Sequence, residues 1–266
     1  MEKYNVKFKK KLGQNFLKDT RIVRRIVDVG GVDSQSLVIE VGPGGAIMTK
    51  ELALAAKNVL AYEIDSDLTE ELSFKLRDYS NVDILFQDFL EADLEKDVMN
   101  YQYRKLLFIS NVPYYITTPI VFKLIQSNLA FDKIVMMVQK EVGERFTTTP
   151  GSREYGSISV LLQYYFDVKK EFLVSRKEFI PEPNVDSVII SFQYKKDRLP
   201  VKDVTFFEKI VRDSFQFKRK NIKNNLKSYD LQVVKTILEH FGYDLTVRAE
   251  MLGVEVFVEL ANSLLK

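Results

Sequence analysis

The chain has 266 residues, 46% of them hydrophobic and 29% charged, which is long enough to bury a core and typical of a globular protein. It has no cysteine and one histidine, which excludes a disulfide framework, a cysteine nucleophile and a metal site built from thiolates or several histidines. No apolar run approaches the roughly 20 residues that cross a bilayer, and the first residues lack a signal-peptide core. We therefore expect a cytoplasmic protein without membrane association.

The net charge is only +2, but the basic residues gather in two segments. One segment lies within the first 25 residues and includes Lys9, Lys10 and Lys11. The other contains Lys218, Arg219, Lys220 and Lys223. Each segment is either a solvated face or a surface that binds the phosphate backbone of a nucleic acid, and composition alone leaves both interpretations open.

Hydrophobic periodicity predicts an α/β protein followed by a small helical domain. A helix is expected to begin at Asp19 or Thr20 and to run through Val29. Further expected strands are 37–41, 59–62, 82–86, a run ending at Asn111, 134–138, and an antiparallel hairpin of 172–175 with 188–192. Further expected helices are 47–56, 118–127, one starting at 139, 157–166, 205–215, 220–226, 231–241, 248–251 and 255–264. A polar stretch at 195–200 places the domain boundary between 196 and 197.

A glycine-rich turn follows the first predicted strand and includes Gly42 and Gly44. Glycines there allow a tight turn and a close approach of the backbone to a ligand. Glu63 ends the next strand 21 positions after Gly42, where an acid can bind ribose hydroxyl groups. Asp88 follows the third strand and can accept a hydrogen bond from an adenine amine, although an aspartate at a strand end is also an ordinary turn or helix cap. The combination predicts a cofactor that contains a nucleoside.

The sequence Asn111-Val112-Pro113-Tyr114 comes directly after a buried strand. The Asn111 side-chain oxygen and a carbonyl next to or within Pro113 can accept hydrogen bonds from one exocyclic amine, and the Tyr114 ring can stack on a planar base. The alternative is a strand-ending turn with a core tyrosine. A proline-rich loop after Phe179 can bring that ring near the site, and Phe179 in the core is again the alternative.

The glycine-rich turn and the ribose acid fit either a nicotinamide dinucleotide or S-adenosylmethionine. Hydride transfer needs a general acid or base near the reacting carbon, and the only histidine, His240, lies in the helical domain. Methylation of an adenine N6 needs acceptors that make the amine nucleophilic, which Asn111 and the Pro113 region supply. The residues thus favour S-adenosylmethionine as cofactor, with no metal.

Five motifs together resemble the ribosomal RNA adenine dimethyltransferases, most closely their small-subunit branch. These motifs are residues 12–17 (LGQNFL), 40–44 (EVGPG), 111–114 (NVPY), 150–157 (PGSREYGS) and 179–187 (FIPEPNVDS). The resemblance covers nearly the whole chain and implies a Rossmann-like methyltransferase domain (1–196) and a helical RNA-binding domain (197–266). It implies transfer of two methyl groups from S-adenosylmethionine to N6 of each of two adjacent adenosines in a hairpin of small-subunit (16S) rRNA. The expected partner is this rRNA or the assembling small ribosomal subunit, bound by a monomer.

The resemblance also implies roles for individual residues. The expected cofactor ligands are Asn15, Leu17, Gly42, Gly44, Glu63, Asp88 and Asn111. The expected target-site residues are Asn111, Pro113, Tyr114 and Phe179, with the two rings on either side of a flipped adenine. Ala46, where many members have glycine, and Val112, where leucine or isoleucine is commoner, are mild departures from the family pattern.

Three alternatives remain open at this point. The nearest is a large-subunit rRNA adenine dimethyltransferase of the macrolide-resistance type, which shares the cofactor site and the target chemistry. The stretch 215–226 with Arg248-Ala249-Glu250 resembles the small-subunit group instead. A non-catalytic RNA-binding relative, or more distantly a dinucleotide oxidoreductase, would keep the fold without the methyl transfer.

Overall fold

A computed structural model describes residues 15–265, so the expected RNA contacts of Lys9, Lys10 and Lys11 lie outside the described residues. The described chain divides into two compact units. The first contains the residues up to Gly143 and Lys169–Gln193, and the second contains Glu144–Val168 and the residues from Tyr194 onward. The expected domain roles and the boundary at 196/197 stay predictions, but the segment 144–168 groups with the C-terminal helices.

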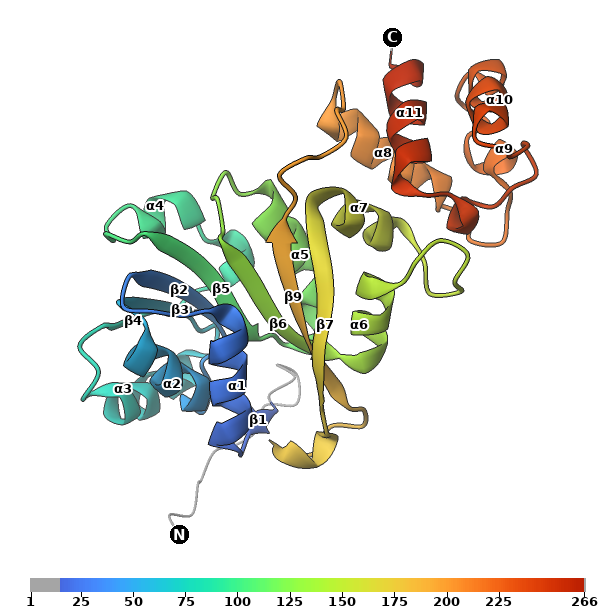
Figure 1. The fold of residues 1–266 in the computed structure, drawn as a ribbon. Helices are drawn as coiled ribbons and strands as arrows, with labels where there is room; N and C mark the ends of the chain where they lie inside the picture. The colour runs from blue at the N-terminus through green and yellow to red at the C-terminus, as the bar shows by residue number, and fades with distance from the viewer. Residues whose placement is uncertain (1–14, 266) are drawn as a thin grey trace. The chain divides into compact units, whose positions relative to one another are not determined.

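The first unit is built on a seven-stranded sheet with the order β4-β3-β2-β5-β6-β9-β7 (Figure 1). Its strands are β2 (Ser36–Val41), β3 (Asn58–Tyr62), β4 (Val82–Leu85), β5 (Lys105–Asn111), β6 (Lys133–Gln139), β7 (Phe166–Val174) and β9 (Ser187–Tyr194). Strands β4, β3, β2, β5 and β6 pair in parallel, and β9 pairs with β6 antiparallel. The expected α/β architecture is therefore confirmed. A separate two-residue ribbon pairs β1 (Phe16–Leu17) with β8 (Phe179–Ile180).

Both faces of the central strands β2, β5 and β6 are buried, which explains their nearly continuous apolar sequences. Alternate residues of β5 point to opposite faces of the sheet. Leu107 and Ile109 contribute to an apolar layer shared with α1 and α2, whereas Phe108 packs near Phe89 of the loop after β4. The helices of this unit are α1 (Thr20–Gly30), α2 (Ile47–Ala55), α3 (Thr69–Leu76), α4 (Leu94–Val98) and α5 (Thr117–Gln126), with α6 (Lys140–Thr147) at the unit boundary.

The chain enters and leaves α1 as its sequence predicts. Asp19 caps the helix by accepting a hydrogen bond from the Arg21 backbone N–H at 2.8 Å. Gly31 ends it in the left-handed conformation with φ of 66°. The other expected elements of this unit occur within a few residues of their predicted bounds, apart from β7, which begins at Phe166 and so continues directly from the preceding helix.

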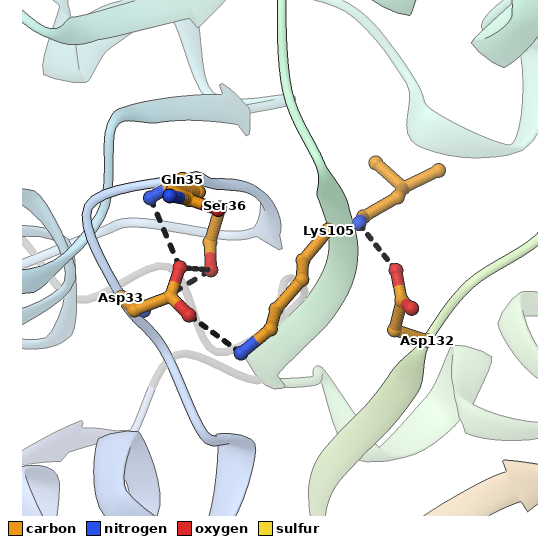
Figure 2. A network of polar contacts seen from close by, with 6 residues as sticks. Asp33, Gln35, Ser36, Lys105 and Asp132 are labelled. Atoms are coloured by element: carbon orange, nitrogen blue, oxygen red, sulfur yellow. Dashed lines mark hydrogen bonds and ion pairs between the residues drawn. The ribbon is translucent and has the colours of Figure 1, made fainter.

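Charged side chains fix the register of the sheet at the amino end of its strands (Figure 2). Lys105 at the start of β5 donates to Asp33 before β2, with 2.5 Å between Nζ and Oδ2. The other Asp33 oxygen accepts from the Gln35 backbone N–H and the Ser36 hydroxyl, each at 2.9 Å. These bonds, led by that from Lys105, lower the pKa of Asp33 to about 2. Asp132 accepts from the Leu106 backbone N–H at 2.8 Å and so ties β6 to β5.

The second unit is helical and packs around aromatic side chains. Its helices are α7 (Ser157–Tyr165), α8 (Val204–Ser214), α9 (Ile222–Asn225), α10 (Leu231–His240), a 3-10 turn (Ala249–Met251) and α11 (Val254–Leu264). Tyr164 of α7 lies 4.5 Å from Phe207 of α8 between ring centroids, and Phe215 lies 5.7 Å from Phe257 of α11. Helix α7 is almost entirely buried, so its apolar residues form part of the core of this unit.

Candidate active site

A cavity of about 220 Å³ opens at the carboxyl ends of β2, β3, β4 and β5, where ligands bind in open α/β sheets. Every side chain that lines it belongs to the first unit. Its lining includes six residues expected from the sequence to contact the cofactor, which are Asn15, Gly42, Gly44, Glu63, Asp88 and Asn111, as well as Pro113 and Tyr114. The glycine-rich turn, Glu63, Asp88 and the NVPY motif therefore line one cavity.

The glycine-rich turn leaves no room for a side chain at Gly44. Gly42 and Gly44 have φ values of 74° and 47°, in the region that favours glycine. A Cβ atom on Gly44 would lie 2.3 Å from Cε1 of Phe16, so the aromatic ring of β1 lies directly against the turn. A small backbone cradle covered by an aromatic ring suits a flat or extended ligand that passes close to the main chain.

Glu63 is held in place by the backbone on both sides. Its Oε2 accepts from the Gly44 N–H at 3.2 Å, and its Oε1 accepts from the Asp65 N–H at 2.9 Å. The carboxyl group is 4% exposed, and burial raises its pKa despite these two bonds. Each carboxylate oxygen has a second lone pair, so Glu63 can still accept from a diol.

Asp88 caps a turn and also lines the cavity, so its position is compatible with both interpretations given in the sequence analysis. One oxygen accepts from the Leu90 N–H at 2.8 Å at the start of a 3-10 turn, Phe89–Glu91. The other oxygen, Oδ2, has no part in that bond. An adenine amine is a donor of the kind that this atom can accept.

Glu40, from the EVGPG motif, is buried within β2 beside the cavity. Burial raises the pKa of this carboxyl group to about 8, and the nearby Glu63 contributes in the same direction. Its Oε2 atom has no hydrogen-bond partner among the described residues. Burial and the neighbouring carboxyl group thus both favour the protonated, neutral form of this side chain.

Asn111 ends β5 and faces the N-terminal segment of the described chain. Its Nδ2 donates to the Asn15 carbonyl at 3.1 Å, which leaves Oδ1 as the acceptor for another group. The next two residues turn the chain sharply, because the Pro113 carbonyl accepts from the Ile116 N–H at 3.1 Å. An amide oxygen and a turn of backbone carbonyls thus face one end of the cavity.

Tyr114 is fixed by a residue to which the sequence assigned no role. Its hydroxyl lies 2.7 Å from the Ser187 hydroxyl at the start of β9, and Ser187 is fully buried. Burial raises the pKa of Tyr114, so the phenol stays protonated at neutral pH. Ser187 is the last residue of the FIPEPNVDS motif, which explains why a distant motif accompanies the NVPY motif.

Two expected site residues do not reach the cavity in this structure. Phe179 is 1% exposed and packs in the apolar layer with Leu17, its partner in the β1–β8 ribbon. An adenine can reach the Phe179 ring only if the residues that cover it move. The stacking role of Phe179 and the cofactor contact of Leu17 stay predictions, and the core alternative describes their positions here.

Several cavity residues were not assigned roles from the sequence. Besides Ser187, which lies behind Tyr114, the additional lining residues are Phe16, Val41, Tyr62, Ile64, Gln87, Phe89, Val112, Tyr115 and Ile116. Phe16 belongs to the LGQNFL motif, and Ile64 follows the ribose acid directly, so both lay within patterns already noted. Tyr115 is 54% exposed and carried no sequence signal beyond its neighbour Tyr114.

The parallel sheet, the glycine-rich turn and the acid at the end of β3 define a Rossmann-like fold with a site for a nucleoside-containing cofactor, and the NVPY motif at the same cavity favours an S-adenosylmethionine-dependent methyltransferase. A family model described as "Ribosomal RNA adenine dimethylase" matches residues 5–266. The chain belongs to this family, and it is an enzyme that dimethylates adenine in ribosomal RNA with S-adenosylmethionine. Among the described residues, no helix is both long and apolar enough to span a membrane.

Individual relatives support the same assignment. "Ribosomal RNA small subunit methyltransferase A" of Bacillus mycoides is 44% identical over 275 residues, covering 100% of this chain and 94% of the relative. The enzyme of the same name from Bacillus anthracis is 43% identical, covering 99% and 94%. A dimethyladenosine transferase from Plasmodium falciparum has a TM-score of 0.75 and 25% identity, covering 92% of this chain and 95% of that structure.

The structure of a 23S rRNA methyltransferase, ErmE, is also similar, with a TM-score of 0.71 and 26% identity, covering 94% of this chain and 99% of that one. The 26% sequence identity between this chain and ErmE is well below the 44% identity to the small-subunit relative from Bacillus mycoides. The large-subunit alternative is therefore not favoured.

Proposed function

We propose that the cavity holds the two reactants side by side, with S-adenosylmethionine toward Gly42, Gly44, Glu63 and Asp88 and the target adenine toward Asn111. The bond from Asn111 Nδ2 to the Asn15 carbonyl supports this arrangement of the two reactants, because it leaves the side-chain oxygen of Asn111 to accept a hydrogen bond from an incoming amine. When bound, the cofactor supplies an activated methyl group on its sulfonium centre. The glycine-rich cradle and the open acceptors of Glu63 and Asp88 fit its nucleoside.

At the target side, two acceptors are proposed to bind the two hydrogens of adenine N6. Asn111 Oδ1 takes one hydrogen. The Pro113 carbonyl already accepts from Ile116, so the Val112 carbonyl is the better acceptor for the other. Hydrogen bonds in two directions draw the nitrogen lone pair out of conjugation with the ring and make it nucleophilic. The first methylation would release one N6 proton to solvent, so one hydrogen remains, and a single acceptor is enough to position the nitrogen for the second methyl transfer.

Tyr114 is proposed to stack on the target base. The bond to Ser187 fixes its ring, so the flipped adenine meets a surface that is already in position. Phe179 would provide the second ring only after the β1–β8 ribbon moves.

The second unit is proposed to bind RNA through its basic turn. Lys218, Arg219, Lys220 and Lys223 are all exposed, as a phosphate-binding surface requires. The proposed partner is the hairpin with two adjacent adenosines in the rRNA of an assembling small subunit. We further propose that the enzyme acts as a monomer in the cytoplasm.

The decisive experiment offers labelled S-adenosylmethionine and the enzyme to unmethylated small ribosomal subunits and, separately, to large-subunit rRNA. Each RNA is then digested and analysed for dimethyladenosine. Label in two adjacent adenosines of the small-subunit RNA alone is the expected result. Label in the large-subunit RNA would contradict the proposed target, and absence of label in both RNAs despite cofactor binding would point to a missing assembly factor or another nucleic-acid target.

A further inference from the structure

The turn between α8 and α9 presents an aromatic ring in the middle of the basic cluster. Phe217 is 53% exposed and is followed directly by Lys218, Arg219 and Lys220, which are exposed as well. A single exposed apolar residue is common on protein surfaces and means little alone. The rigidity of this turn and the environment of the ring make the position informative.

The backbone of Phe217 is held on both sides by one buried side chain. Its N–H donates to Asn225 Oδ1 at 3.0 Å, and Asn225 Nδ2 donates back to the Phe217 carbonyl at 3.4 Å. The same carbonyl accepts from the Lys220 N–H at 2.8 Å and closes the turn. Asn225 is 6% exposed, so a buried residue of α9 fixes the backbone from which the ring projects. The backbone of this turn therefore loses little entropy when the ring binds a partner.

The surroundings of another exposed ring, that of Phe74, are different. Phe74 is 65% exposed, but the guanidinium of Arg77 lies 4.4 Å above its ring centroid and covers one face. Within residues 15–265, no cation or second ring lies over Phe217 in this way. Its ring is therefore available for stacking.

We propose that Phe217 stacks on an unpaired base of the RNA whose phosphates contact Lys218, Arg219 and Lys220. Aromatic rings beside cations bind single-stranded or looped RNA, because unpaired bases expose a flat π-face while the backbone meets the positive charge. Three adjacent cations argue against an apolar protein partner, since charged residues are depleted at the cores of protein interfaces. This inference rests on the proposed RNA-binding role of the basic turn.

The test measures the affinity of the full chain for unmethylated small ribosomal subunits as a function of salt. Phe217→Ala should weaken binding roughly tenfold, the size of one base-on-ring stack, whereas Phe217→Trp should bind at least as tightly as wild type. A ring releases no counterions, so the slope of log Kd against log salt should stay unchanged in Phe217→Ala. Lys218→Ala should reduce that slope.

Phe74→Ala is the matched control, because it removes an exposed phenylalanine outside the basic turn. An affinity of Phe217→Ala within twofold of Phe74→Ala would overturn the proposal. A reduced salt slope in Phe217→Ala would also overturn it, because the turn itself would then have changed. Failure of the wild type to bind or methylate the subunits would instead refute the proposed function.

A second measurement uses the absence of tryptophan from the chain. Phe217→Trp and Phe74→Trp each introduce a single fluorophore. Protein-free small-subunit rRNA, with binding followed by gel shift, should quench the emission of the first variant and leave the second unchanged. Unquenched emission from bound Phe217→Trp would contradict stacking.

Discussion

The two ends of the parallel sheet carry polar residues that are satisfied in different ways. At the amino end, the charge of Asp33 is paired with that of the Lys105 side chain (Figure 2). At the carboxyl end, Glu63 and Asp88 are held by backbone N–H groups. Those bonds fix the position of each carboxylate. The remaining lone pairs of its oxygens can accept hydrogen bonds from a ligand in the cavity.

This difference separates polar groups that hold strands together from polar groups that bind a ligand. An ion pair between strands uses its charge within the protein. A carboxylate that is positioned by backbone N–H groups can still accept hydrogen bonds from a bound ligand. Substitutions at the two ends should therefore affect different properties, activity at the carboxyl end and acid stability at the amino end.

The largest effect is expected for Asn111→Ala. The variant loses the proposed acceptor for the target amine, and methyl transfer should fall by about 100-fold or more, comparable to loss of one key polar group in other active sites. Single-turnover methylation of unmethylated small subunits measures the loss, and filter binding should show RNA affinity largely retained. Near-normal turnover would remove Asn111 from the mechanism.

Glu63→Gln should rank second. An amide replaces one carboxylate oxygen with a donor, so an acceptor for the cofactor ribose or for the Gly44 N–H is lost. We expect the KM for S-adenosylmethionine to rise roughly tenfold, in line with a hydrogen bond to a charged group, with a smaller change in kcat. The exposed Glu70→Gln serves as control, and equal KM values for the two variants would refute the ribose assignment.

Ser187→Ala should have a moderate effect, because it removes the partner of the Tyr114 hydroxyl. One neutral hydrogen bond corresponds to about a fivefold change, which should appear in kcat. Tyr114→Phe deletes the same bond from the other side and keeps the ring. A double variant no worse than either single variant would show that both act through this bond, whereas additive losses would indicate separate roles.

The smallest effect is expected for Lys105→Met, at the opposite end of the sheet. Lys105 lowers the pKa of Asp33 in the folded state, so its stabilisation is present above the unfolded pKa near 4 and is lost as pH falls toward 2. The difference in unfolding free energy between wild type and variant should be constant from pH 5 to 7 and shrink below pH 4. Denaturant titrations at several pH values measure it, and unchanged methylation is the accompanying expectation.

The sequence predicted most of the fold and eight of the residues that line the cavity, because these depend on local patterns. Apolar runs placed the strands, and Asn111, Glu63 and Asp88 each follow such a run, so their convergence at one edge follows from parallel pairing. The apolar run of α7 predicted a helix but did not indicate which helices cover it. That depends on tertiary packing, which periodicity does not encode.

The position of Phe179 and the role of Ser187 could not be predicted for the same reason. Both lie in one proline-rich motif that returns to the site from a distant part of the chain. The motif placed an aromatic ring near the cavity, yet pairing of β8 with β1 turns Phe179 into the apolar layer. Ser187, to which the sequence assigned no role, is the residue whose hydroxyl group is hydrogen-bonded to the Tyr114 hydroxyl.

Ala46, at the end of the glycine-rich turn, has an evolutionary consequence. It is the only described residue other than glycine with positive φ, at 63°, which costs an alanine roughly 1 kcal/mol. Its methyl group is fully buried beside Leu68 and Leu72, which offsets much of that strain. Glycine would relieve the strain and lose the packing, so the two residues are close to equivalent here. Lineages can exchange them by one nucleotide change under weak selection, and either residue at this position is compatible with a working enzyme.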